Sequence, residues 1–152
     1  MLTRRRRRLA ACAILPLATL IVAACASRSA LAPVAPPVRA SFEPGLIVKG
    51  ADLARIGNCA DCHTAAHGKP YAGGRPLKTP FGTIYGTNIT PDSETGIGTW
   101  PEAAFARAMR EGVDREGRHL YPAFPYDHFT RLTDEDVRAL YAFIMTRGRL
   151  RR

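Results

Sequence analysis

The chain has 152 residues and a formal net charge of +9, from 22 Lys and Arg against 13 Asp and Glu. Five of the basic residues are the consecutive arginines Arg4–Arg8, and without them 17 basic residues face 13 acidic ones, a balance of +4. The excess charge is therefore mostly N-terminal, which excludes a nucleic-acid-binding surface as the reason for it. The length fits one small domain.

Residues 1–26 are predicted to be an export leader. The arginine run precedes an apolar stretch over residues 9–24, followed by small residues, which is the order of a secretory signal. That stretch is short and alanine-rich for a membrane-spanning helix, which needs about 20 strongly apolar residues, so an uncleaved anchor is the less favoured alternative. The segment Val22-Ala23-Ala24-Cys25 also resembles a bacterial lipoprotein box, which makes Cys25 a candidate for lipidation. The other reading is ordinary signal cleavage at an A-x-A site formed by Ala24-Cys25-Ala26.

Residues 27–44 are predicted to be a linker, because the segment is rich in Pro and Ala and favours extended backbone. The folded domain is expected over residues 45–148. A polypeptide core of this size is modest. A buried cofactor would be its largest hydrophobic element.

The first helix is expected over residues 45–58, with Leu46, Ile47, Leu53 and Ile56 on one apolar face. It leads into Cys59-Ala60-Asp61-Cys62-His63, a C-x-x-C-H pattern typical of covalently attached haem c. The thiols of Cys59 and Cys62 can form thioethers with vinyl groups along one porphyrin edge, and the imidazole of His63 can coordinate the iron as proximal ligand.

Other readings of the cysteine pair are a thioredoxin-like dithiol, a structural disulfide, or a zinc site with His67. A thioredoxin-like dithiol expects a βαβ context, which the flanking sequence lacks. Zinc needs two further ligands at finger-like spacing, and no cysteine follows Cys62. One covalent haem c is therefore the predicted cofactor.

The remaining helices are predicted from their ends. Thr99-Trp100-Pro101-Glu102 reads as a capping box before a helix to Arg110, with Gly112 as its C-terminal cap. Thr133 opens a last helix that closes at 147–148. Residues 69–98 are rich in Gly, Pro, Thr and Asn, which predicts a loop wrapped around a cofactor. The buried stripe expected on the last helix is Val137, Leu140, Tyr141 and Ile144.

No succession of strands appears, so the predicted fold class is all-α. It has three main helices and long loops wrapped around one covalent haem.

Several stretches between residues 45 and 147 follow one pattern: 57–64, 71–74, 80–92, 96–98, Trp100, 108–113, 120–123 and 134–137. They resemble the cytochrome c subunits of bacterial membrane-associated periplasmic dehydrogenases, of the alcohol, gluconate and sorbitol types. The cytochrome partners of isoquinoline- and nicotinate-type molybdenum hydroxylases are similar. The resemblance implies a class I-like cytochrome c fold. Many family members string three such haem domains together, whereas this chain carries one motif.

The sequence departs from this family at the sixth iron ligand. The family pattern has methionine between Pro-Ala and Pro-Tyr, where this chain has Phe124, which cannot coordinate iron. His128, four residues later, is the favoured replacement, and a solvent-facing histidine is its alternative. Met145 and Met109 are further candidates, each with a core position as the alternative. An iron with an open sixth position is the fourth possibility.

The predicted function is electron transfer without substrate chemistry. The donor would be a periplasmic dehydrogenase with a molybdenum, flavin or quinone cofactor, and the acceptor another cytochrome, a quinone site or an oxidase. The expected location is the periplasmic side of a bacterial membrane, lipid-anchored through Cys25 or soluble. The competing hypothesis is a haem protein with an open or weakly held sixth ligand, acting as a peroxidase-like enzyme or small-ligand sensor.

Overall fold

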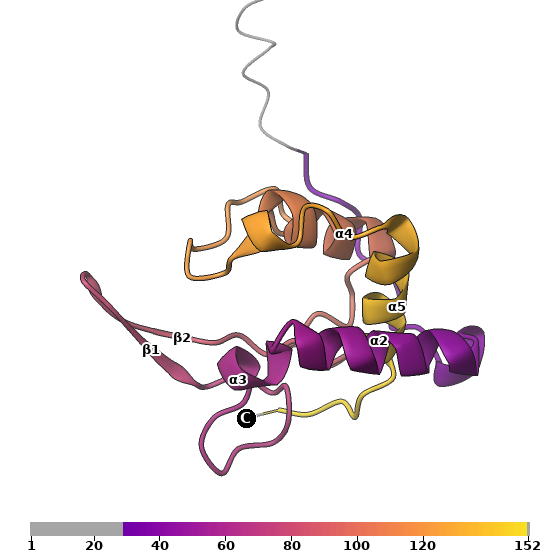
Figure 1. The fold of residues 1–152 in the computed structure, drawn as a ribbon, viewed down its shortest axis with the longest axis horizontal. Helices are drawn as coiled ribbons and strands as arrows, with labels where there is room; N and C mark the ends of the chain where they lie inside the picture. The colour runs from indigo at the N-terminus through magenta and orange to yellow at the C-terminus, as the bar shows by residue number, and fades with distance from the viewer. Residues whose placement is uncertain (1–28, 152) are drawn as a thin grey trace, which may run out of the picture. The chain divides into compact units, whose positions relative to one another are not determined.

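A computed structural model describes residues 29–151, and its folded unit begins at Leu31. The predicted leader and the lipidation candidate Cys25 lie outside the described residues. The elements in chain order are η1 (Arg39–Ser41), α2 (Pro44–Ile56), α3 (Cys59–His63), β1 (Pro76–Thr79), β2 (Gly82–Tyr85), α4 (Glu102–Glu111), η2 (Tyr126–His128) and α5 (Asp134–Met145). Three of the α-helices are the three predicted ones, and the fourth, α3, contains the cysteine motif (Figure 1).

The core is built where α2 crosses α5. Ile47, Gly50 and Ala54 follow one another at helical spacing on the buried face of α2. A Cβ on Gly50 would lie 1.9 Å from the carbonyl oxygen of Ala139, so the two backbones touch at this glycine. Only a residue without a side chain permits that approach.

The last helix is buried on almost every side. The predicted stripe of Val137, Leu140, Tyr141 and Ile144 is confirmed, and Phe143 and Met145 are buried as well. The ring of Tyr141 meets Phe42 edge to face, with 6.0 Å between centroids, and lies 5.7 Å from Phe105 of α4. The segment before α2 and the helix α4 therefore complete the core around α5.

The prediction that Ile56 belongs to the buried face of α2 is wrong. Ile56 is 78% exposed, although Ile47 is buried. At about 100° per residue, Ile56 lies roughly half a turn away from Ile47. The buried face runs through Gly50 and Ala54 instead, which carry little apolar surface and were not recognisable by hydrophobicity.

The all-α prediction is not confirmed, because β1 and β2 pair as an antiparallel hairpin with Leu77 opposite Ile84. The two-residue turn is Pro80-Phe81, and the Thr79 hydroxyl donates to the carbonyl of Gly82 at 2.8 Å. Each strand has only four residues, so neither carries a long alternating pattern. The hairpin extends away from the helices, with Phe81 92% exposed at its turn (Figure 1).

The helix ends differ from the predicted caps in one place. The capping box expected at Thr99 is not formed, because α4 begins later, after Pro101, and no side chain caps it. Gly112 does end α4 in the left-handed conformation, with φ 64°, as predicted. A capping box occurs at α5 instead: Thr133 Oγ1 accepts from the Asp136 amide at 3.1 Å, and Asp136 accepts from the Thr133 amide at 3.2 Å.

The segment before α2 makes specific backbone contacts with the rest of the unit. Leu31 donates to the carbonyl of Arg115 at 2.8 Å, and Val34 donates to that of Thr99 at 3.0 Å. Between residues 29 and 151, no helix is long and apolar enough to span a bilayer.

Candidate functional site

The cysteine motif occupies its own short helix directly after α2. Asn58, with φ 53°, takes the left-handed conformation that separates the two helices, so α3 begins at Cys59. Positions three residues apart lie on the same helical face, which places Cys59 and Cys62 side by side. Both thiols are free and half-buried, and burial raises the pKa of Cys59. The site therefore offers two unbonded thiols along one edge.

The main chain fixes which ring nitrogen of His63 carries the proton. Its Nδ1 lies 2.7 Å from the carbonyl oxygen of Thr87. Because a carbonyl only accepts, Nδ1 carries the proton and Nε2 carries the free lone pair. Burial lowers the pKa of His63, and the hydrogen bond to Thr87 raises it in partial opposition. A neutral imidazole with Nδ1–H fixed by a carbonyl is the usual arrangement of a metal-ligating histidine.

Glycines bring the Thr87 carbonyl to this position. A Cβ on Gly86 would lie 1.8 Å from the carbonyl oxygen of Cys62, and one on Gly73, where φ is 78°, would lie 2.6 Å from the Asn88 amide nitrogen. Gly73 also donates to the carbonyl of His63 at 2.8 Å. The loops around residues 71–75 and 86–88 therefore cross directly against α3, at distances that no other residue type allows.

The loop that contains Phe124 packs near the start of the cysteine motif. The rings of Phe124 and Phe129 stack with 5.7 Å between centroids and 21° between planes. Phe129 in turn lies 3.3 Å from where a Cβ of Gly57 would be, two residues before Cys59. Phe124 therefore belongs to an aromatic pair packed at the entry to the motif.

The candidate sixth ligands have very different environments. The side chain of His128 is 76% exposed on η2, and its Nε2 lies 3.8 Å from an Asp127 carboxylate oxygen. Met109 and Met145 lie inside the core cluster, 7% and 3% exposed. Among residues 29–151, no three His, Cys, Asp or Glu side chains are grouped as the zinc reading with His67 would require.

The role of Thr87 was not predicted. It acts through its backbone carbonyl, and a carbonyl leaves no mark on the type of residue that carries it. The available signal was indirect: Gly73, Gly74 and Gly86 mark places where the chain passes close to another backbone.

The donor set fits a covalently attached haem, since it combines two free thiols three residues apart with an imidazole whose Nε2 is free to bind iron. Helices packed around such a motif define a c-type haem protein. The chain belongs to the cytochrome c family: the sequence model described as "Cytochrome c" matches residues 47–148. Membership of this family implies covalently bound haem c.

The chain is similar to parts of three much longer bacterial proteins. It is 54% identical over 124 residues to a subunit of the nicotinate dehydrogenase of Pseudomonas putida, covering 82% of this chain and 10% of the relative. It is 52% identical over 103 residues to the cytochrome c subunit of the quinone alcohol dehydrogenase of Gluconobacter oxydans, covering 68% and 22%. It is 51% identical over 100 residues to the gluconate 2-dehydrogenase cytochrome c subunit of Pantoea cypripedii, covering 66% and 23%. The chain thus spans a quarter or less of each relative.

Proposed function

We propose that this chain is an electron-carrier cytochrome c that takes electrons from a dehydrogenase and passes them to a respiratory acceptor. The observation that carries the proposal is the 2.7 Å hydrogen bond from His63 Nδ1 to the Thr87 carbonyl, beside two free thiols. Haem c, when bound, supplies reversible one-electron chemistry at its iron. The residues of the chain fix the imidazole, exclude water from part of the site and supply no substrate chemistry.

The proposal assigns one haem to the chain. The sequence contains a single C-x-x-C-H motif, and the two cysteines outside it, Cys12 and Cys25, are not paired at that spacing. Cys59 and Cys62 would hold the haem covalently, and His63 would be the proximal iron ligand.

The names of the relatives support the kind of donor. Cytochrome c subunits of alcohol and gluconate dehydrogenases and a subunit of nicotinate dehydrogenase share about half of their matched residues with this chain. We assign a dehydrogenase as donor, and another cytochrome, a quinone site or an oxidase as acceptor. The export signal in the sequence supports the periplasmic side as the location, and Cys25 is the proposed point of lipid attachment.

His128 is the proposed sixth ligand. Its side chain is exposed on a single turn of 3-10 helix and is not packed in the core. Met109 and Met145 lie in α4 and α5 and are buried in the core cluster, where a methionine commonly serves packing.

Haem attachment is tested by expressing the whole chain in a host that matures c-type cytochromes. Pyridine haemochrome analysis and intact mass should give one haem per chain. Cys59→Ser and Cys62→Ser should each lose a thioether bond, and Cys25→Ser, the matched control, should keep both while losing any lipid. A parent protein without covalently attached haem would overturn the proposal.

The carrier role is tested separately from attachment. The ferrous protein should be low-spin and should bind carbon monoxide slowly, because a protein ligand occupies the sixth position. Rapid stoichiometric binding with a high-spin spectrum would favour the peroxidase-like or sensor alternative. Low-temperature EPR should change in His128→Ala and stay as in the parent in Met109→Leu and Met145→Leu; an unchanged His128→Ala spectrum would reject His128 as ligand.

A further inference from the structure

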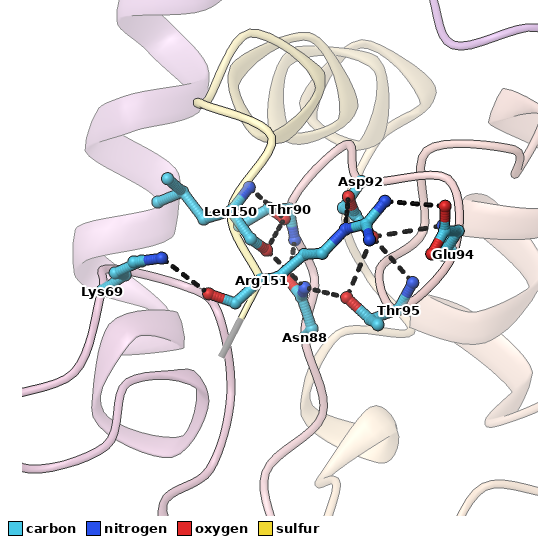
Figure 2. Close-up of polar contacts among 8 residues, drawn as sticks. All are labelled: Lys69, Asn88, Thr90, Asp92, Glu94, Thr95, Leu150 and Arg151. Carbon is cyan, nitrogen blue, oxygen red and sulfur yellow. Dashed lines mark hydrogen bonds and ion pairs between the residues drawn. The ribbon is translucent and has the colours of Figure 1, made fainter.

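The segment after α5 returns to the loop that follows Thr87 (Figure 2). The Leu150 carbonyl accepts from Asn88 Nδ2 at 2.7 Å and from the Thr90 hydroxyl at 3.1 Å. Arg151 lies beside them, with Nε 3.2 Å from Asp92 Oδ2 and a terminal nitrogen 2.7 Å from Glu94 Oε1. Residues 150–151 therefore lie beyond residue 148, the predicted end of the domain, and yet they contact the loop over residues 88–94 within that domain.

Polar contacts run from Arg151 to Asn88. Asp92 receives Arg151 on Oδ2 and the Thr95 hydroxyl on Oδ1, at 2.9 Å. Thr95 Oγ1 in turn accepts from Asn88 Nδ2 at 2.9 Å. Asn88 is buried, and its Oδ1 accepts the Thr90 amide at 2.8 Å, so this side chain is held by both of its polar atoms (Figure 2).

Asn88 is the residue next to Thr87, whose carbonyl fixes the His63 imidazole. The position of that carbonyl depends on the backbone between residues 87 and 88. A buried asparagine with every contact satisfied leaves this backbone little freedom to move. The cluster of Asn88, Thr95, Asp92, Leu150 and Arg151, here called the C-terminal latch, is thus one peptide bond away from the proximal hydrogen bond.

We propose that Arg151 is a positioning residue for His63, which acts through the C-terminal latch to hold the Thr87 carbonyl against Nδ1–H and so lowers the reduction potential of the site. The inference rests on the proposed function, since it needs an iron on Nε2. A carbonyl that accepts from Nδ1–H raises the basicity of the imidazole, and a more basic ligand favours ferric over ferrous iron. Loosening the latch lengthens this hydrogen bond and favours the ferrous form.

The chain contains a matched control for Arg151. Arg118 makes the same kind of fork: its Nε donates to Asp114 Oδ2 at 2.8 Å, and a terminal nitrogen lies 3.2 Å from Glu116 Oε2. In both forks the arginine is largely exposed and the aspartate is mostly buried. The ion pairs of the Arg118 fork lie within residues 114–118 and share no residue with the latch, so Arg118→Gln removes an equivalent ion pair and leaves the contacts of the latch in place.

The experiment compares Arg151→Gln, Arg118→Gln and the parent, each as the full chain with haem attached. Spectroelectrochemical titration should show that the ratio of ferrous to ferric iron at a fixed ambient potential is about threefold higher in Arg151→Gln than in the parent. For a one-electron couple, this corresponds to a rise of about 30 mV in the reduction potential. Arg118→Gln should keep the parent potential, and Arg151→Lys should fall between. Solvent exchange of the His63 Nδ1–H proton, followed by NMR, should quicken only in the Arg151 variants.

Thr95→Val provides an independent break in the same latch if Arg151→Gln fails to accumulate with haem. It removes the hydroxyl between Asp92 and Asn88 and should shift the potential in the same direction. Parent-like potentials and exchange rates in haem-loaded Arg151→Gln and Thr95→Val would overturn the inference while leaving the carrier function intact. Failure of the parent chain to bind haem would instead remove the proposed function on which the inference stands.

Discussion

Replacing Gly50 by alanine should test the α2–α5 contact most directly. The added Cβ would meet three atoms of α5: the carbonyl oxygen of Ala139 at 1.9 Å, its carbonyl carbon at 2.5 Å and Phe143 Cβ at 2.8 Å. Comfortable contacts between such atoms are about 3.5 Å, so the helices must separate by roughly 1.5 Å. Two of the three atoms belong to backbone, which cannot rotate away.

The size of the effect follows from two opposing contributions. Overpacking a core costs about 1–3 kcal/mol, and a clash with backbone belongs at the upper end. Alanine recovers about 1 kcal/mol of helix propensity relative to glycine. The net loss is about 2 kcal/mol, and since 1 kcal/mol shifts the Tm of a domain of about 100 residues by about 4–8 °C, the Tm should fall by about 8–16 °C.

Gly45→Ala is the matched control, because it makes the same substitution in the same helix. No atom lies within 4 Å of the Cβ that it adds, so only the gain in helix propensity remains. Thermal unfolding of both variants, followed by circular dichroism on the haem-loaded chain, should show an unchanged or slightly raised Tm for Gly45→Ala. A Gly50→Ala Tm equal to that of Gly45→Ala would refute the close crossing of α2 and α5.

Three other predictions concern the site and α5. Gly86→Ala places a Cβ 1.8 Å from the Cys62 carbonyl oxygen, so the yield of haem-loaded protein should fall sharply on a haem-stained gel. The Lys49 ammonium, 2.9 Å away, and the Thr133 cap lower the pKa of Asp136 to about 2, so its stabilising contribution is present above about pH 4 and is lost as pH falls toward 2. The acid-induced decrease in Tm should be shallower in Asp136→Asn, and an identical slope would contradict this assignment. Thr133→Ala should cost about 1 kcal/mol in denaturant unfolding, whereas Thr130→Ala, which breaks no cap, should cost less.

The parts of the fold that were predicted correctly are those that the type and spacing of neighbouring side chains indicate. The stripe on α5 repeats large apolar residues at helical spacing, and Gly112 stands at the position where a helix needs a left-handed residue. The cysteine motif is recognisable because it combines three reactive side chains in five residues, and haem attachment at those residues stays a prediction. Each of these signals is local.

The features that escaped prediction depend on distant backbone. The close crossing at Gly50 depends on Ala139, and the fixed tautomer of His63 depends on the Thr87 carbonyl. The residues next to Gly50 and His63 in the sequence do not indicate either contact. Thr99-Trp100-Pro101-Glu102 matched the residue types of a capping box, yet α4 begins only after Pro101, since a type match says nothing about hydrogen-bond geometry. The hairpin was missed because four-residue strands provide too few alternations.

The pairing of α2 with α5 also bears on how the core forms during folding. The two helices lie near opposite ends of the folded unit in the sequence, so forming the core closes a long loop. Closing this loop costs conformational entropy, which slows the formation of the contact. The thiols of Cys59 and Cys62 lie inside that loop. Until α5 docks, both cysteines belong to a stretch of chain whose ends are not yet held together. On the proposed function, haem would be attached to these thiols while the loop is open, so a variant that closes this loop faster should yield less haem-loaded protein.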